Sequence, residues 1–101
     1  MLYVVKRDGR LVDFDSLKIS KAIKRAANET GDNIKESELL EIVKKVISYI
    51  ELSEKEKINV EEIQNLIEKA LLLNNYINVK NVYSSYRKER TKVREIKSDL
   101  M

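Results

Sequence analysis

The chain has 101 residues, a length that fits one domain. Its 20 basic and 17 acidic residues give a net charge of only +3, and 43% of its residues are hydrophobic, so the composition is that of a folded protein. Because the sequence has no cysteine and no histidine, it excludes disulfides, a zinc knuckle, a thiol nucleophile and histidine as a general base.

The first elements predict a β-hairpin over residues 2–14. Leu2 to Val5 is apolar and partly β-branched, and the apolar alternation resumes from Leu11 to Phe14. Between them, Asp8-Gly9 is a hairpin signal, because glycine accepts the positive φ that a tight turn requires.

A first helix is predicted between Asp15, as the N-cap, and Gly31, as the left-handed terminator. Its apolar face comprises Ile19, Ala22, Ile23 and Ala26. A second helix is predicted over residues 36–50, with a face of Leu39, Val43, Val46 and Ile50 that Leu40 and Ile47 widen.

Residues 57–60 are predicted to form a short extended segment that pairs with the hairpin, since a two-stranded hairpin is only marginally stable by itself. A third helix is predicted over residues 61–73, capped by Asn59 or a neighbour and ended by Asn74-Asn75. Its core stripe comprises Ile63, Leu66, Ile67, Ala70 and Leu71.

A fourth helix is predicted over residues 77–97, with Val79, Val82, Tyr83, Tyr86 and Val93 along one side. Beyond Tyr86 this helix becomes strongly charged and carries little apolar surface to bury. The sequence therefore predicts a domain over residues 1–90 and a charged helical extension or linker over residues 91–101.

Cations next to the hairpin turn form the first candidate site. Lys6 and Arg7 lie close to the helix start at Asp15, where free N–H groups and the positive end of the helix dipole favour a phosphate. The alternative is an ordinary solvated turn. Because successive strand residues point to opposite faces, Lys6 and Arg7 face one ligand only if the turn twists them together.

Two further groups are candidates for ligand contacts. Lys18, Lys21 and Arg25 recur at helical spacing and form a basic stripe, which is either a ligand site or the solvent face of an amphipathic helix. Gln64, with Asn59 and Asn65 nearby, offers amides of the kind that bind bases and ribose hydroxyls.

Familiar enzyme and membrane signals are missing. Gly9 and Gly31 are the two glycines of the chain, which excludes the P-loop and the dinucleotide-binding fingerprint. We predict no catalytic residue and no metal site. No apolar run approaches the ~20 residues that cross a bilayer, and the N-terminus lacks a signal-peptide pattern, so a cytoplasmic protein is expected.

Four segments in this order resemble ATP-cone domains: VVKRDGR, FDSLKISKAIKRA, INVEEIQNLIEKAL and VYSSYRKER. The resemblance covers about residues 3–90. It implies a mainly α member of the α+β class, in which a four-helix bundle is capped by a small three-stranded sheet containing the N-terminal hairpin. ATP-cones occur at the N-terminus of ribonucleotide reductase large subunits, and the charged tail is similar to the lead into an anaerobic reductase.

The resemblance implies a nucleotide between the hairpin and the first helix. Lys6 and Arg7 match the phosphate-binding pair. The remaining matched positions are Val12, Asp15 and Lys18 near base, ribose and phosphate, Val60 and Gln64 near the nucleoside, and Lys88 closing on the phosphates from the last helix.

The implied function is allosteric rather than catalytic: ATP or dATP, with Mg²⁺, would control the activity and oligomeric state of a reductase. The implied partners are an adenine nucleotide, the rest of a reductase chain or another subunit, and a second copy of the chain. Val12, Val60 and Gln64 depart from residues found in some members, which leaves open a degenerate cone that acts only as a structural or oligomerisation module. Nucleic-acid binding is disfavoured because acidic residues interrupt the basic tail.

Overall fold

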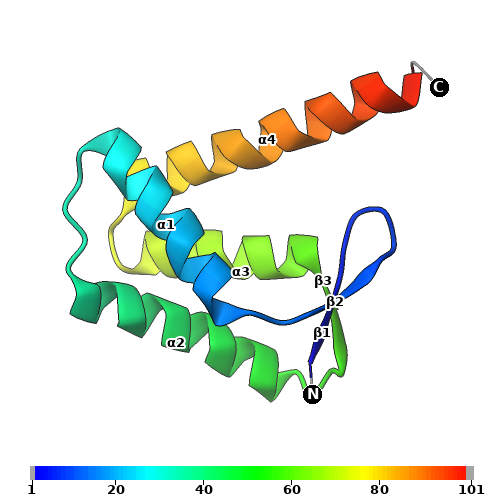
Figure 1. Ribbon diagram of the computed structural model, residues 1–101. Helices are drawn as coiled ribbons and strands as arrows, with labels where there is room; N and C mark the ends of the chain where they lie inside the picture. Colours follow the sequence, from blue (N-terminus) through cyan, green and yellow to red (C-terminus); the bar gives the residue numbers. More distant parts are fainter. Residues whose placement is uncertain (1, 100–101) are drawn as a thin grey trace.

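The computed structural model describes the backbone of residues 2–99 and the side chains of residues 2–88. Its elements, in chain order, are β1 (Tyr3–Val5), β2 (Leu11–Asp13), α1 (Ser16–Thr30), α2 (Glu36–Leu52), β3 (Lys57–Asn59), α3 (Val60–Leu73) and α4 (Ile77–Asp99). Figure 1 shows the three strands at one end of a body made of the four helices. The predicted α+β fold, mainly helical with a small sheet, is confirmed.

The three strands form one mixed sheet with β1 in the centre. β1 pairs antiparallel with β2 and parallel with β3, so that Val4 lies beside both Val12 and Ile58. In the hairpin turn, the Gly9 N–H donates to the Lys6 carbonyl over 2.9 Å, and Gly9 has a φ of 88°. The residue most tolerant of positive φ therefore sits where the turn needs it.

Three predicted helix ends are confirmed in detail. Asp15 caps α1, because its Oδ1 accepts a hydrogen bond of 3.0 Å from the Leu17 N–H, and Gly31 ends the helix with a φ of 77°. At the end of α3, Asn75 is left-handed, and the Tyr76 N–H donates to the Leu71 carbonyl over 2.9 Å.

At the start of α3 the predicted N-cap position is confirmed, but the side chain does not cap the helix. Asn59 occupies this position and makes no capping hydrogen bond through its side chain. Glu61 and Glu62 instead place two carboxylates in the first turn, where the positive end of the helix dipole stabilises them.

The core lies where the four helices meet the inner face of the sheet. Its buried side chains are Val4, Ile19, Ile23, Ala26, Ala27, Leu39, Ile42, Val43, Val46, Ile50, Ile58, Ile63, Ile67, Ala70, Leu71, Val79 and Tyr83. Two predictions on α2 were wrong: Leu40 is 55% exposed, whereas Ile42, which the prediction omitted, is buried.

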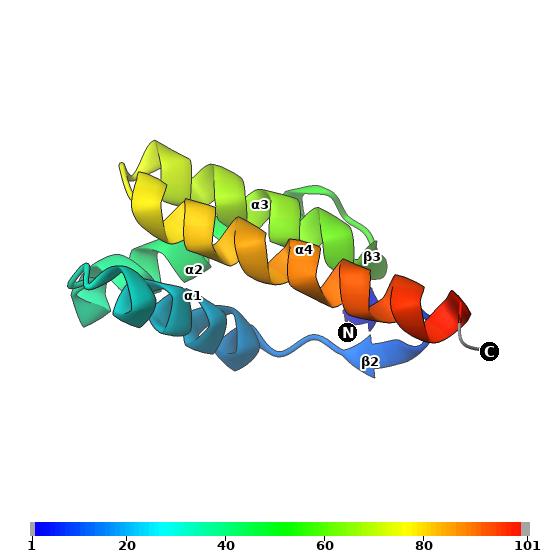
Figure 2. The same ribbon diagram turned by 90° about the horizontal axis from the view of Figure 1, so that it is seen from above.

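The first part of α4 packs on α1 and α3, and its far end projects past the hairpin (Figure 2). Val79 and Tyr83 are buried, and Val82 and Tyr86 pack against the core. The predicted contact of Val93 lies outside the described side chains, and the role of residues 91–101 as an extension stays a prediction. Within the described residues, no helix combines the length and the apolar character needed to cross a membrane.

Candidate functional site

A cavity of about 480 Å³ opens between the hairpin, the first half of α1 and the start of α3, with α4 behind it. This volume is in the range of small-molecule sites. Its apolar lining comprises Val4, Val12, Phe14, Ile19, Ala22, Val60, Ile63, Ile67 and Tyr83, and its polar lining comprises Lys6, Asp13, Asp15, Lys18, Lys21, Arg25 and Gln64.

Cations outnumber carboxylates in this lining by four to two. Lys6 is half-buried, and the three cations of α1 are exposed at the edge of the cavity. The cavity therefore combines an apolar surface that can hold a planar ring with charges that favour an acidic group.

Six of the eight residues predicted as nucleotide contacts lie in this lining: Lys6, Val12, Asp15, Lys18, Val60 and Gln64. They come from three separate segments, which the fold brings together because β1 pairs with both β2 and the strand that leads into α3. The juxtaposition that the sequence suggested is therefore present, although ligand contact by these residues stays a prediction.

The start of α1 is partly occupied by its own cap. The Asp15 carboxylate accepts from the Leu17 N–H, so this N–H group is already paired. An anion in the cavity would rely on side-chain cations more than on the helix N-terminus that the sequence analysis invoked.

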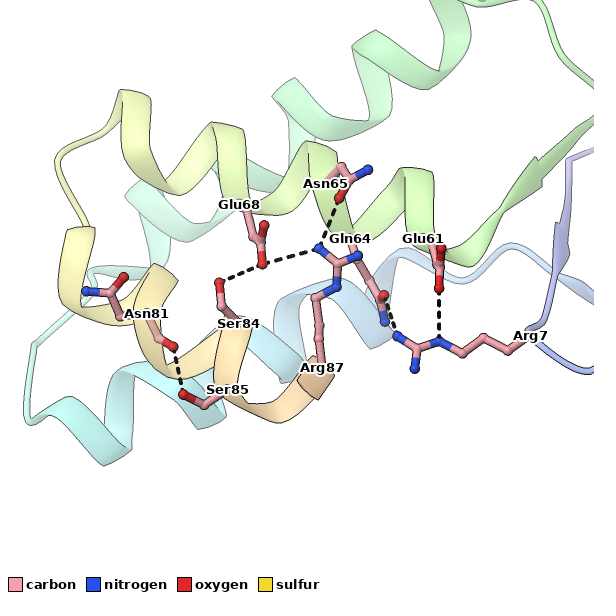
Figure 3. Close-up of polar contacts among 9 residues, drawn as sticks. All are labelled: Arg7, Glu61, Gln64, Asn65, Glu68, Asn81, Ser84, Ser85 and Arg87. Atoms are coloured by element: carbon pink, nitrogen blue, oxygen red, sulfur yellow. Dashed lines mark hydrogen bonds and ion pairs between the residues drawn. The ribbon is translucent and has the colours of Figure 1, made fainter. Parts of the chain in front are cut away.

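Arg7 lies outside the cavity lining, unlike its neighbour Lys6. As Figure 3 shows, its side chain reaches from the hairpin loop to α3, where Nη2 donates to Gln64 Oε1 over 3.2 Å and Nε lies 3.6 Å from Glu61 Oε1. The two cations thus have different surroundings, but β1 ends at Val5, so both lie beyond the strand and the predicted strand alternation is not the cause.

Lys88 is exposed and is also absent from the lining. Its neighbour Arg87 is held on α3, with Nη1 at 3.0 Å from Asn65 Oδ1 and at 3.2 Å from Glu68 Oε1 (Figure 3). Direct contact of Arg7 and Lys88 with a phosphate stays a prediction.

Lys21 and Arg25 extend the site beyond the predicted set. The guanidinium carbon of Arg25 also lies 4.9 Å from the centre of the Tyr86 ring, and the Tyr86 hydroxyl donates to Glu29. The signal for both residues was the basic stripe that begins at Lys18, which the sequence alone could not separate from a solvent-facing stripe.

No group of three or more potential metal ligands occurs among the described residues. Asp13 and Asp15 do contribute two carboxylates to the cavity. One or two carboxylates together with ligand phosphates are a typical environment for Mg²⁺, which usually keeps several waters.

The fold and this cavity define a small, mainly helical domain with a cavity lined by four cations. The model of the ATP cone domain family matches residues 2–92, and the chain belongs to this family. ATP cones are nucleotide-binding allosteric domains of ribonucleotide reductases, and they are regulatory rather than catalytic.

Relatives of several reductase types match the chain at similar identity. The alpha subunit of ribonucleoside-diphosphate reductase from Chlamydia pneumoniae is 30% identical, over 93% of this chain and 10% of the relative. The vitamin B12-dependent ribonucleoside-diphosphate reductase of Thermoplasma acidophilum is 35% identical, over 93% of this chain and 12% of the relative. The anaerobic ribonucleoside-triphosphate reductase of Salmonella typhimurium is 32% identical, over 92% of this chain and 13% of the relative.

The chain therefore spans between 10% and 13% of the length of these relatives. Since oxygen-independent and other reductase types match about equally well, the comparison does not select the anaerobic type that the charged tail suggested.

Proposed function

We propose that this chain is an allosteric domain that binds ATP and dATP and that controls the activity and oligomeric state of a ribonucleotide reductase. The observation that carries the proposal is the cavity, in which four cations surround an apolar wall in a chain of the ATP cone family. Mg²⁺ would enter with the triphosphate.

Within the cavity we assign phosphate binding to Lys6 and Lys18, with Lys21 and Arg25 as further cations. The apolar side chains of Val12, together with Val60, would line the nucleoside. The mixed lining supports this division, because a nucleotide has one planar apolar part and one strongly anionic part.

Regulation requires that ATP and dATP favour different arrangements of the domain, since a ligand shifts an equilibrium only by its differential affinity. The two nucleotides differ by one ribose hydroxyl, so the response must pass to a larger element. α4 is suited to this role because Tyr83 lines the cavity and Tyr86 stacks on the cavity residue Arg25.

Thermal unfolding and light scattering with each nucleotide test this function. At a nucleotide concentration of 100 times Kd, binding stabilises the folded state by ~2.7 kcal/mol, which raises the Tm of a domain of this size by roughly 10 °C. In the parent reductase, ATP and dATP should give different assemblies.

An unchanged Tm with both nucleotides would contradict binding and would favour the degenerate cone, a structural or oligomerisation module. A raised Tm with identical assembly in ATP and dATP would leave binding intact but contradict the regulatory half of the proposal.

A further inference from the structure

Arg7 has an environment that a flexible surface arginine would lack. Its side chain is only 16% exposed, although it starts from a hairpin loop in which Asp8, Gly9 and Arg10 are all exposed. Its guanidinium meets two side chains of the first turns of α3, Gln64 and Glu61, as Figure 3 shows.

The chemistry of this contact fixes the orientation of the Gln64 amide. A guanidinium has five N–H donors and no acceptor, so the Gln64 atom that it meets at 3.2 Å must be the carbonyl oxygen Oε1. The amide NH₂ group is then the part of the Gln64 side chain that can donate to other groups. Without Arg7, the amide could turn over and present either group.

Gln64 also lines the cavity, whereas Arg7 does not. Gln64 therefore joins Arg7 to the cavity, and an amide whose carbonyl is engaged has N–H donors left for a ligand atom that accepts hydrogen bonds. The nucleoside part of an adenine nucleotide carries such acceptors on its ring nitrogens and ribose oxygens.

Glu61, one turn before Gln64 on α3, also contacts Arg7 and supports the same arrangement. Its Oε1 lies 3.6 Å from Arg7 Nε, while Arg7 Nη2 points to Gln64. The rigid fork of the guanidinium makes the two contacts compatible, because its donors point in fixed directions.

We propose that Arg7 is a positioning residue: it holds the Gln64 carbonyl, so that the Gln64 amide N–H groups recognise an acceptor on the nucleoside. This inference rests on the proposed nucleotide-binding function. It differs from a direct Arg7–phosphate contact, because Arg7 then acts through Gln64 and its effect does not depend on the number of phosphates.

The test measures the affinities of Arg7→Ala, Gln64→Ala and the double variant for ATP, ADP, AMP and adenosine, by calorimetry and, for weak ligands, by NMR titration. We expect Arg7→Ala to weaken all four ligands by the same factor, about tenfold, as for the loss of one hydrogen bond of ~1.4 kcal/mol. We expect the double variant to be no weaker than Gln64→Ala.

Matched controls separate this effect from charge and folding. Arg10→Ala removes a cation from the same loop, but the Arg10 side chain is 69% exposed and pairs with Asp8, so the four affinities should stay unchanged. Lys6→Ala, in the cavity wall, should weaken ATP more than AMP. Gln64→Glu should keep or raise the Tm, because it strengthens the pair with Arg7. The same variant should lower the affinity for the uncharged ligand adenosine, because it removes the N–H donors.

A loss that grows from AMP to ATP in Arg7→Ala, or losses that multiply in the double variant, would overturn the inference in favour of direct phosphate contact. A lowered Tm with unchanged affinities would reduce Arg7 to a structural residue. If the unmodified protein bound none of the four ligands, the proposed function itself would fail, and this inference with it.

Discussion

At the scale of single residues, the basic stripe of α1 brings more charge to the cavity than the resemblance implied. Lys18, Lys21 and Arg25 are exposed on the helix and still line the cavity, because the hairpin and the start of α3 stand beside this face of α1. An exposed cation that borders a cavity can meet an anionic ligand without first losing much of its own hydration.

We predict that Lys21→Ala lowers the affinity for ATP about fivefold, as expected for a loss of ~1 kcal/mol from one exposed charge. The loss should shrink as salt is raised, because exposed charges are screened. Calorimetry at two ionic strengths measures both effects.

Lys24→Ala is the matched control for this prediction. Lys24 lies on the same helix but outside the cavity lining, with its Nζ at 2.6 Å from Glu36 Oε1. Equal losses in the two variants would show that only the net charge of the domain matters.

Roles that depend on neighbours along the chain could be assigned from the sequence, whereas the role of the basic stripe on α1, which depends on a distant segment, was left open between two alternatives. Asp15 and Gly31 could be assigned because a helix cap is a local arrangement. The solvent-facing and cavity-facing alternatives for Lys21 and Arg25 could not be separated, because the second wall of the cavity comes from α3, about 40 residues further along.

At the scale of elements, polar contacts along one stripe of α3 fasten both the hairpin and α4 to this helix. Glu61 and Gln64 receive Arg7 from the hairpin loop, while Asn65 and Glu68 receive Arg87 from α4 (Figure 3). The side chains of Arg87 and Glu68 are 20% and 21% exposed, so water screens this pair less than a fully exposed one. α3 therefore connects the cavity, which Gln64 lines, to α4, which Arg87 joins to it.

The turn between α3 and α4 is tied to the start of α2 by a hydrogen bond from the Tyr76 hydroxyl to Glu38. This bond, together with burial and the charges of Glu38 and Asp32, raises the pKa of Tyr76 from 10.0 to about 12. The contact exists only while the hydroxyl keeps its proton.

We predict that this contact stabilises the fold fully below pH 10 and that its contribution is lost as the pH rises towards 12. The sign follows because the pKa is higher in the folded state, so the unfolded chain releases the proton first and gains stability with rising pH. Tyr76→Phe should remove this component, which denaturant unfolding measured between pH 9 and 12 would detect.

Tyr49→Phe is the control, because Tyr49 is 37% exposed on α2 and belongs to the same residue type. If the two variants and the unmodified protein had parallel pH profiles, the Tyr76–Glu38 contact would not contribute to stability.

The errors on α2 have a simple cause at this scale. Its apolar residues cover a wider arc than the helix buries, with Leu40 at one edge and Ile42 at the other. The pattern alone gives the arc but not which edge faces α1 and α3. Likewise, the extended segment at residues 57–60 was predicted, but nothing local determined that β3 would run parallel to β1.

At the scale of the whole molecule, the sheet and the helices cooperate to make one site. The hairpin loop that follows β1 brings Lys6 to the cavity, α1 brings the basic stripe, and α3 brings Gln64. α4 closes the back of the cavity with Tyr83 and continues as one helix to Asp99.

Isothermal titration with ATP and Mg²⁺, on the unmodified chain, Lys6→Ala and Lys44→Ala, tests the central claim most directly. Lys44 is exposed on α2, which contributes none of the residues found to line the cavity. We predict saturable binding that Lys6→Ala weakens at least about tenfold, as for a charge-assisted contact of ~1.5 kcal/mol or more, and that Lys44→Ala leaves unchanged. No binding to the unmodified chain, or equal binding by all three, would contradict a nucleotide site in this cavity.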